Sequence, residues 1–335
     1  MTRPRRAFVS TGALPDASLV ASLVTETYER FATVDEGDVS TVYPALAEVE
    51  PDRFGICVVA TSGRTYAAGD AEALFTIMSV AKPFVFALVS AERSAEEVRR
   101  RIGVNATGLP FNSSEAVGRG DGRTNPLVNP GAIATTSLTP GRSLEDRWAW
   151  LRDGLARFAG RSLEVDERVY DSASSSNHVN RELTRLLTER GVVAGDPADA
   201  LELYTRQSSL TVTARDLATM AATLADGGVN PVTRERVVDQ ETCRWTLAVM
   251  TTAGLYETSG DWLCDVGLPG KSGIGGGIVT VAPGKGGLGT FSPRLDEAGN
   301  SVRGQLAARF LSRTLGLDVF ASEPELSTAA DSVSA

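Results

Sequence analysis

The sequence predicts an α+β fold in which strands from both ends of the chain form one antiparallel sheet, flanked by helices and a helical subdomain. Strand-like apolar segments occur early, at residues 54–60 and 65–68, and again late, at residues 277–282 and 288–291. Between them, from about residue 85 to 250, the pattern is mostly helical. Because apolar strands have to bury their faces in a common core, we expect the early and late strands to pair.

The individual elements follow from local patterns along the chain. Ser62-Gly63 marks a turn that joins the first two strands as a hairpin. A helix is predicted to begin near Ser79 and to continue to residue 94, which places Pro83 in the first turn, where proline is tolerated. The other predicted helices cover residues 144–158, 180–189, 198–207, 214–226 and 305–317.

The composition is that of a globular domain between two polar ends. With 335 residues, 42% of them apolar, the chain is long enough to bury a large core. We expect a single domain over residues 17–320. Residues 1–16 and 321–335 are rich in small and polar residues and contain proline, which predicts poor order.

Charge and hydropathy exclude several classes of partner. The net charge is −9 with acidic and basic residues interspersed, whereas binding to nucleic acid needs a basic face. No run of about 18 apolar residues is present, and the N-terminal apolar segment is too interrupted for a signal peptide. The cysteines Cys57, Cys243 and Cys264 are too scattered for a disulfide framework or a metal knuckle. We therefore expect a cytoplasmic protein that binds neither nucleic acid nor a membrane.

Lysine is rare in this chain, and its few positions are informative. Of the 33 basic residues only Lys82, Lys271 and Lys285 are lysines, and all the others are arginines. Arginine stays protonated in proteins, whereas a buried lysine can lose its proton and act as a base. Each lysine therefore marks a position where that chemistry can be required.

Ser79 and Lys82 form a Ser-x-x-Lys pair at the start of a predicted helix. Residues three apart lie on one helix face, so the Lys82 amine can reach the Ser79 hydroxyl. The helix N-terminus also favours negative charge on the serine oxygen. Apolar neighbours such as Phe75 and Phe84 predict a buried pair rather than a surface serine and a solvated lysine. We interpret Ser79 as a nucleophile and Lys82 as its base.

A second lysine motif, Lys271-Ser272-Gly273, fits the same chemistry. Serine enzymes that use Ser-x-x-Lys carry a related Lys-Thr/Ser-Gly element, here expected on a strand beside the pocket. Gly270-Lys271-Ser272 also resembles the end of a phosphate-binding P-loop. Asp265, however, stands where that motif requires its first glycine, and a strand-like segment follows instead of a helix, so the P-loop interpretation fails.

Two other features lead to no catalytic prediction. Residues 284–289 match G-x-G-x-x-G, but they lie between two strands and are interpreted as a hairpin turn with a solvated Lys285. His178 is the only histidine, and no G-x-S-x-G elbow is present. We therefore expect neither a Ser-His-Asp triad nor a metal site, and we interpret His178 as a polar helix residue.

The segments around these motifs resemble the bacterial and mitochondrial-type glutaminase family over roughly Gly37 to Phe320. The most specific of them are NPLVNPGAI (125–133), LATMAATLADGGVNP (217–231), VGLPGKSGI (266–274) and FSPRLDEAGNS (291–301). The resemblance implies a β-lactamase/DD-peptidase-like fold and hydrolysis of the side-chain amide of L-glutamine to L-glutamate and ammonia. It also implies a homo-oligomer and no cofactor.

The resemblance further implies roles for individual residues. It places the nucleophile on Ser79, the base on Lys82, and a relay toward the leaving ammonia on Tyr256. Lys271 is expected at the substrate pocket, where its charge would help to keep Lys82 neutral. The remaining substrate-binding positions, including the backbone N–H of Ile274 in an oxyanion hole, are Asn129, Asn180, Tyr204 and Ile274.

The chain departs from the family pattern at three positions. Val42 takes the place of a tyrosine, with Tyr43 beside it, and Met78 takes the place of a glutamine. Ala173 takes the place of a glutamate that pairs with the α-amino group of the substrate, with Asp171 as a possible substitute. Two alternatives therefore stay open: a serine amidohydrolase or peptidase of the same fold with another amide substrate, and a catalytically weak binding homologue.

Overall fold

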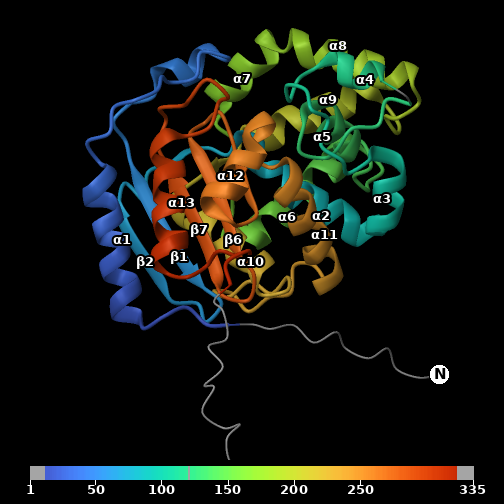
Figure 1. Ribbon diagram of the computed structural model, residues 1–335. Coiled ribbons are helices and arrows are strands. Elements are labelled where there is room, and N and C mark those ends of the chain that lie inside the picture. Colours follow the sequence, from blue (N-terminus) through green and yellow to red (C-terminus); the bar gives the residue numbers. More distant parts are fainter. Residues whose placement is uncertain (1–11, 120, 323–335) are drawn as a thin grey trace, which may run out of the picture.

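The structure, a computed structural model, describes residues 12–119 and 121–322 and contains a five-stranded antiparallel sheet (Figure 1). The strand order is β2-β1-β7-β6-β5, so the predicted pairing of early and late strands is confirmed through β1 and β7. The expected poor order at the two ends falls mostly on residues outside the described ranges. The strands are β1 (Gly55–Ala60), β2 (Thr65–Gly69), β5 (Gly270–Ser272), β6 (Gly277–Ala282) and β7 (Gly286–Phe291).

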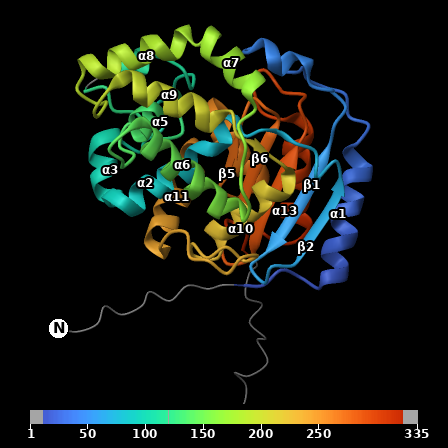
Figure 2. The ribbon, with the colours of Figure 1, turned by 180° about the vertical axis from the view of Figure 1, so that it is seen from behind.

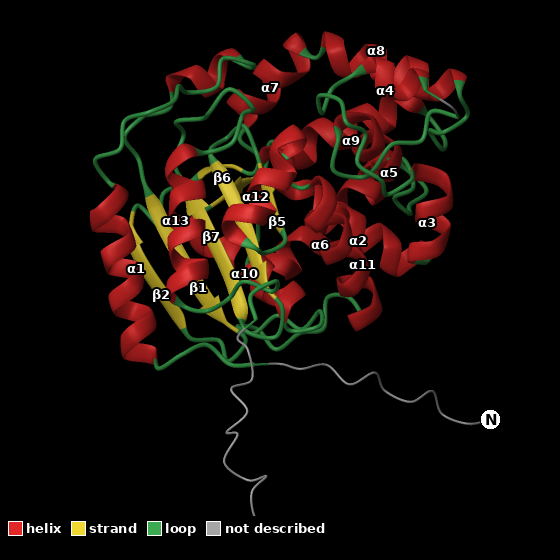
Figure 3. Ribbon diagram, in the orientation of Figure 1, coloured by secondary structure: helices red, strands yellow, loops and turns green. Residues whose placement is uncertain are grey.

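Helices cover both faces of this sheet, which Figure 3 shows in yellow. One face carries α1 (Ala17–Phe31), α12 (Ser259–Val266) and α13 (Val302–Thr314), and the other carries α10 (Ala214–Ala225), as the two opposite views show (Figures 1 and 2). No helix in the described part of the chain combines the length and apolar character needed to cross a membrane.

The other helices form the helical part of the molecule, above the sheet and beside its β5 edge (Figure 2). They are α2 (Ala81–Arg93), α3 (Ala95–Ile102), α4 (Ser114–Gly118), α5 (Asn129–Thr136), α6 (Leu144–Ala159), α7 (Glu167–Ser176), α8 (His178–Glu189), α9 (Pro197–Ser208) and α11 (Gln240–Ala253). Two short strands, β3 (Phe75–Thr76) and β4 (Thr211–Val212), pair where this part meets the sheet. Short 3₁₀ turns cover Pro44–Glu48, Met78–Val80 and Tyr256–Thr258.

Alternate residues of the central strands enter two different hydrophobic cores. In β1, Ile56 and Val58 pack with residues of α1 and α13, whereas Cys57 and Val59 belong to the core that contains α10. Because successive side chains of a strand point to opposite faces, a continuous apolar run such as GICVVA is what a sheet covered on both faces requires. The core that contains α10 also includes residues of the helical part, so it connects the sheet to those helices.

The predicted helices are confirmed, with small shifts at their ends. The helix expected from Ser79 begins as the 3₁₀ turn Met78–Val80 and continues as α2, so Pro83 does lie in the first α-helical turn. The helix expected over residues 305–317 is α13, which begins three residues earlier because Ser301 caps it. Several elements, among them α1 and the β3–β4 pair, were not individually predicted.

The glycine-rich segment 284–289 requires a correction to the predicted turn. Only residues 283–285 turn, and the following glycines belong to strand β7. A Cβ atom on Gly289 would lie 2.1 Å from the backbone oxygen of Ala214 in α10. The glycines therefore allow α10 to rest directly on the strand, a requirement that comes from tertiary packing and not from turn geometry.

We expect Gly289→Ala to lower the free energy of unfolding by about 1–3 kcal/mol, because the added methyl group forces β7 and α10 apart. Urea unfolding of the purified variant measures this change. Gly260→Ala in α12 is the matched control, since nothing lies within 4 Å of its added Cβ atom. That variant should be neutral or more stable by up to about 1 kcal/mol. Equal stabilities of the two variants would contradict the close contact.

Candidate active site

Ser79 lies in a strained turn between strand β3 and helix α2. Met78, the residue before it, has a left-handed backbone with φ +47°, a conformation that costs about 1–2 kcal/mol for an L-residue. The turn between β5 and β6 packs against it so closely that a Cβ atom on Gly273 would lie 3.1 Å from the Ser79 nitrogen. A Cβ atom on Gly275 would lie 2.4 Å from the backbone oxygen of Thr76. The main chain around the serine therefore rests directly on the turn between β5 and β6.

The Lys82 amine is buried beside an asparagine. Its side chain is 2% exposed, and its Nζ donates a hydrogen bond of 2.7 Å to Oδ1 of Asn129. The aromatic rings of Phe111 and Tyr204 lie 6.0 and 5.8 Å from the same nitrogen. Burial lowers the pKa of Lys82 to about 7. A large fraction of the amine is therefore neutral, and able to accept a proton, near neutral pH.

Lys271 and Tyr256 lie together beside the serine. The Lys271 Nζ donates to the backbone oxygen of Ser272 at 2.5 Å and lies 4.2 Å from the centre of the Tyr256 ring. Burial and then the charge of Lys82 hold the pKa of Lys271 well below its usual value. The Tyr256 side chain is hydrogen-bonded to Ser79, and burial raises its pKa to about 12, so the phenol stays protonated.

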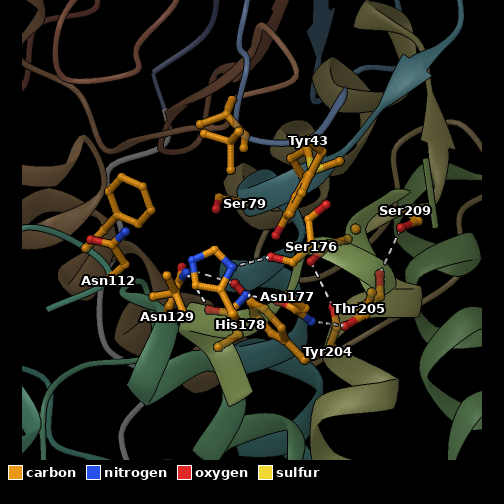
Figure 4. Close-up of a pocket in the computed structure, with 18 residues that line it drawn as sticks. Tyr43, Ser79, Asn112, Asn129, Ser176, Asn177, His178, Tyr204, Thr205 and Ser209 are labelled. Atoms are coloured by element: carbon orange, nitrogen blue, oxygen red, sulfur yellow. Dashed lines mark hydrogen bonds between the residues drawn. The ribbon is translucent and has the colours of Figure 1, made fainter. Parts of the chain in front are cut away.

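A cavity of about 130 Å³ opens at Ser79 (Figure 4). At roughly 10–15 Å³ for each water position, this is room for about ten waters, or for a molecule the size of an amino acid. Figure 4 shows Asn129, Asn177 and Tyr204 together on one side of the cavity and Tyr43 on another. The lining residues are Val42, Tyr43, Met78, Ser79, Phe111, Asn112, Asn129, Ala173, Ser176, Asn177, His178, Val179, Asn180, Tyr204, Thr205, Ser208, Ser209 and Ile274.

Most of the predicted site residues meet at this cavity. Its wall contains Ser79, Asn129, Asn180, Tyr204 and Ile274. Lys82 and Tyr256 do not line it but contact residues that do, through Asn129 and Ser79 respectively. Lys271 also lies behind the wall, which does not fit the expected contact with substrate; the structure places it against Tyr256. Two buried polar residues of the wall, Asn177 and Thr205, were missed, although Asn177 precedes Asn180 by one helical turn and Thr205 follows Tyr204.

The positions that depart from the family pattern also lie at the cavity. Tyr43 lines it and is hydrogen-bonded to Asn180, so a tyrosine hydroxyl is present although Val42 takes the family position. Ala173 is buried in the wall. Asp171 is exposed and does not line the cavity, because two residues along a helix correspond to a rotation of about 200°. Substitution by Asp171 was expected only with a rearranged loop, and helix α7 holds this residue away from the cavity.

His178 begins helix α8 and lines the mouth of the cavity with an exposed ring, whose Nδ1 lies 3.0 Å from the backbone oxygen of Ser176. The lining residues include no aspartate, glutamate, lysine or arginine. The described wall thus offers hydroxyl, amide and imidazole groups, and the Lys82 amine lies just behind it, hydrogen-bonded to Asn129.

Comparison with known proteins identifies the family of this site. The glutaminase family model matches residues 37–320, which is most of the chain. The chain belongs to the glutaminase family. It is 62% identical over 318 residues to glutaminase 2 of Yersinia pestis, covering 95% of this chain and 94% of that protein. It is 44% identical over 307 residues to a glutaminase of Colwellia psychrerythraea, covering 91% and 99% of the two chains.

Solved structures of glutaminases share the fold. A probable glutaminase, YbaS, superposes with a TM-score of 0.90 at 40% identity, covering 92% of this chain and all of that one. Mglu in its glutamate form superposes with a TM-score of 0.86 at 36% identity, covering 90% and 70% of the two chains. The predicted α+β, β-lactamase-like fold is therefore confirmed, and the chain is an amidohydrolase of the family that hydrolyses the amide of glutamine.

Proposed function

We propose that this glutaminase cleaves L-glutamine to L-glutamate and ammonia through an acyl-enzyme on Ser79. The observation that carries the proposal is a buried Lys82 amine, with its pKa lowered to about 7, three residues after a serine that opens on a cavity the size of an amino acid. Mglu, at 37% identity, has been solved in an L-glutamate binding form, so a structural neighbour binds the expected product.

The first step is attack on the amide carbonyl. Neutral Lys82 takes the proton of the Ser79 hydroxyl as the serine oxygen bonds to the amide carbon, and the carbonyl oxygen becomes an oxyanion. The backbone N–H groups of Ser79 and Ile274 are the proposed donors to that oxygen. Each such donor contributes about 2.7–4 kcal/mol to stabilisation of the transition state.

The second step releases ammonia. When the tetrahedral intermediate collapses, the carbon–nitrogen bond breaks and the leaving nitrogen needs a proton. Lys82 carries the proton it took from Ser79. The Tyr256 hydroxyl, hydrogen-bonded to Ser79, passes its proton to the leaving nitrogen and is reprotonated with the proton held by Lys82, which becomes neutral again. Water then attacks the acyl-enzyme with Lys82 again as base, which frees L-glutamate and restores Ser79.

The other residues of the site are proposed to bind the substrate or to adjust the base. Amide N–H groups of Asn129 and Asn180 can donate to the substrate carboxylate, and Tyr204, whose hydroxyl donates to Oδ1 of Asn129 at 3.1 Å, is proposed to hold Asn129 in place for it. For Lys271 the proposal is a mutual effect with Lys82: a proton on either amine disfavours a proton on the other, and the charge of Lys82 is one cause of the lowered pKa of Lys271.

Ammonia and glutamate release from L-glutamine by the purified protein tests the function, with L-asparagine and simple amides in parallel. Turnover of glutamine above that of the other amides is expected. Turnover of another amide but not of glutamine would favour a serine amidohydrolase with a different substrate. No turnover of any amide would favour a catalytically weak binding homologue.

The α-amino group of glutamine is expected to contribute little to binding, because no carboxylate lines the described cavity. The wild-type KM values for L-glutamine and for its desamino analogue, 4-carbamoylbutanoate, should therefore be similar. Ala173→Glu should introduce a preference for glutamine of about 10–100-fold, since a charge-assisted hydrogen bond contributes about 1.5–3 kcal/mol. Ala173→Gln is the uncharged control of similar size. Strong preference for glutamine in the wild type would contradict this prediction.

Two further expectations are also proposals: a cytoplasmic location and a homo-oligomer. Light scattering of the purified protein measures the oligomeric state, and fractionation of the producing cells measures the location.

A further inference from the structure

Three asparagines of the cavity form one directed chain of side-chain hydrogen bonds. Nζ of Lys82 donates to Oδ1 of Asn129 at 2.7 Å, and Nδ2 of Asn129 donates to Oδ1 of Asn180 at 2.9 Å. Nδ2 of Asn180 donates to Oδ1 of Asn177 at 2.6 Å. Nδ2 of Asn177 donates to Oγ1 of Thr205 at 3.0 Å. The asparagines lie on α5, on α8 and at the cap before α8, and Thr205 lies on α9, so the chain ties three helices together.

The direction of this chain is set at its Thr205 end. Oγ1 of Thr205 donates its hydrogen at 2.9 Å to the backbone oxygen of Leu201, one helical turn earlier. A carbonyl oxygen can only accept, so the hydroxyl hydrogen is used there and the hydroxyl oxygen has to accept from Asn177. Each of the three amides then has only one orientation in which its N–H group faces an oxygen and not another N–H group. This constraint passes from Asn177 through Asn180 to Asn129.

The orientation of Asn129 matters for the base. A neutral lysine amine has one lone pair, and proton transfer from Ser79 requires it. If Nδ2 of Asn129 faced Lys82, it would donate to that lone pair and compete with the serine. The Tyr204 hydroxyl, 3.1 Å from Oδ1 of Asn129, does not decide between the two orientations, because a hydroxyl can either donate or accept.

We propose that Thr205 and Asn177 are positioning residues that hold the carbonyl oxygen of Asn129 toward Lys82 and so leave the lone pair of the neutral amine free for Ser79. The inference rests on the proposed role of Lys82 as the base. Both residues are buried, Thr205 and Asn177 each being 5% exposed, so breaking the bond between them costs free energy.

Thr205→Val keeps the shape of the side chain and removes the hydroxyl. It is expected to lower kcat/KM for glutamine by about tenfold or more, the equivalent of one lost hydrogen bond of about 1.4 kcal/mol. The acidic limb of the kcat/KM profile should also move to lower pH, because an amide N–H that faces the Lys82 amine stabilises its neutral form. Thr205→Ser retains the hydroxyl and should restore both properties.

Thr246→Val is the matched control, since Thr246 is a buried helical threonine whose Oγ1 donates to the backbone oxygen of Thr242 at 2.9 Å, and it neither lines the cavity nor bonds to the asparagines. It should leave the pH profile unchanged. Wild-type kinetics in Thr205→Val would overturn the proposal. Equal losses in the Val and Ser variants would also overturn it, because they would indicate a packing role.

A second measurement separates this inference from the proposed function. With only three lysines in the chain, NMR of protein labelled with ¹³C at the lysine Cε positions can follow the titration of Lys82 without substrate. A lower pKa of Lys82 in Thr205→Val than in the wild type and Thr205→Ser supports the proposed role of the hydrogen-bond chain, whether or not glutamine is turned over. An unchanged titration overturns it even if glutamine is hydrolysed.

Discussion

Ser79→Ala is expected to abolish glutamine hydrolysis, with kcat lowered by about 10⁴-fold or more. Removal of the hydroxyl leaves the amide without a covalent partner, and only binding and the oxyanion donors would remain. The fold should persist, because Ser79 lies in a turn held mainly by its backbone. Ammonia release, measured together with far-UV circular dichroism, checks the result.

Ser90→Ala is the matched control for that experiment. Ser90 lies on α2, the helix that follows Ser79, and is 1% exposed with no hydrogen-bond partner for its Oγ among the described residues. Loss of an unpaired buried hydroxyl is nearly neutral for stability and should leave turnover unchanged. Residual glutamine turnover by Ser79→Ala within tenfold of the wild type would show that another group is the nucleophile.

Lys82→Arg is expected to lower kcat by about 10³-fold or more although it preserves the charge. Arginine cannot be deprotonated in a protein, so it cannot take the proton of Ser79. The wild-type kcat/KM should rise with pH through about 7, where the Lys82 amine becomes neutral. Lys285→Arg, at the partly exposed third lysine, is the control and should show no change. Activity of Lys82→Arg close to that of Lys285→Arg would remove Lys82 from the role of base.

The same lysine makes the stability depend on pH. Burial lowers the pKa of Lys82 from 10.5 in the unfolded chain to about 7 in the folded one. Between these values the unfolded state binds the additional proton, so this group makes the protein more stable as pH rises. The inactive Lys82→Met variant has no amine that must lose its proton on folding. At pH 7 its free energy of unfolding should therefore exceed that of the wild type by an amount on the order of a few kcal/mol. The difference should shrink toward pH 10, as urea unfolding at several pH values would show.

The chain's preference for arginine made the site visible in the sequence. Two of the three lysines, Lys82 and Lys271, are the ones that the fold buries completely, whereas Lys285 is partly exposed. A residue type avoided elsewhere marks positions where its particular chemistry is needed. The same argument could not tell how each lysine is joined to the cavity wall: Lys82 donates to Asn129, whereas Lys271 lies against the ring of Tyr256.

Local patterns predicted most of the long helices and the main strands, because periodicity, capping residues and apolar runs act over a few neighbouring residues. The pairing of the two chain ends followed from the need of these strands to bury their faces in a common core. The spacing of Ser79 and Lys82 likewise needed only the geometry of one helical turn. The first two residues of β7, Gly286 and Gly287, were assigned to a turn. Gly287 serves the contact with α10, a partner about 70 residues earlier in the chain.

Only the tertiary structure decided how the distant polar groups are joined. Asn129, Asn177 and Thr205 come from three separate segments, and neither their hydrogen bonds nor the direction of the chain that they form can be inferred from spacing. The same is true of the burial that lowers the pKa of Lys82, and of the absence of a carboxylate from the described cavity wall. The physical reason is that hydrogen-bond direction and desolvation depend on what packs around a side chain, whereas periodicity depends on the side chain's own neighbours in sequence.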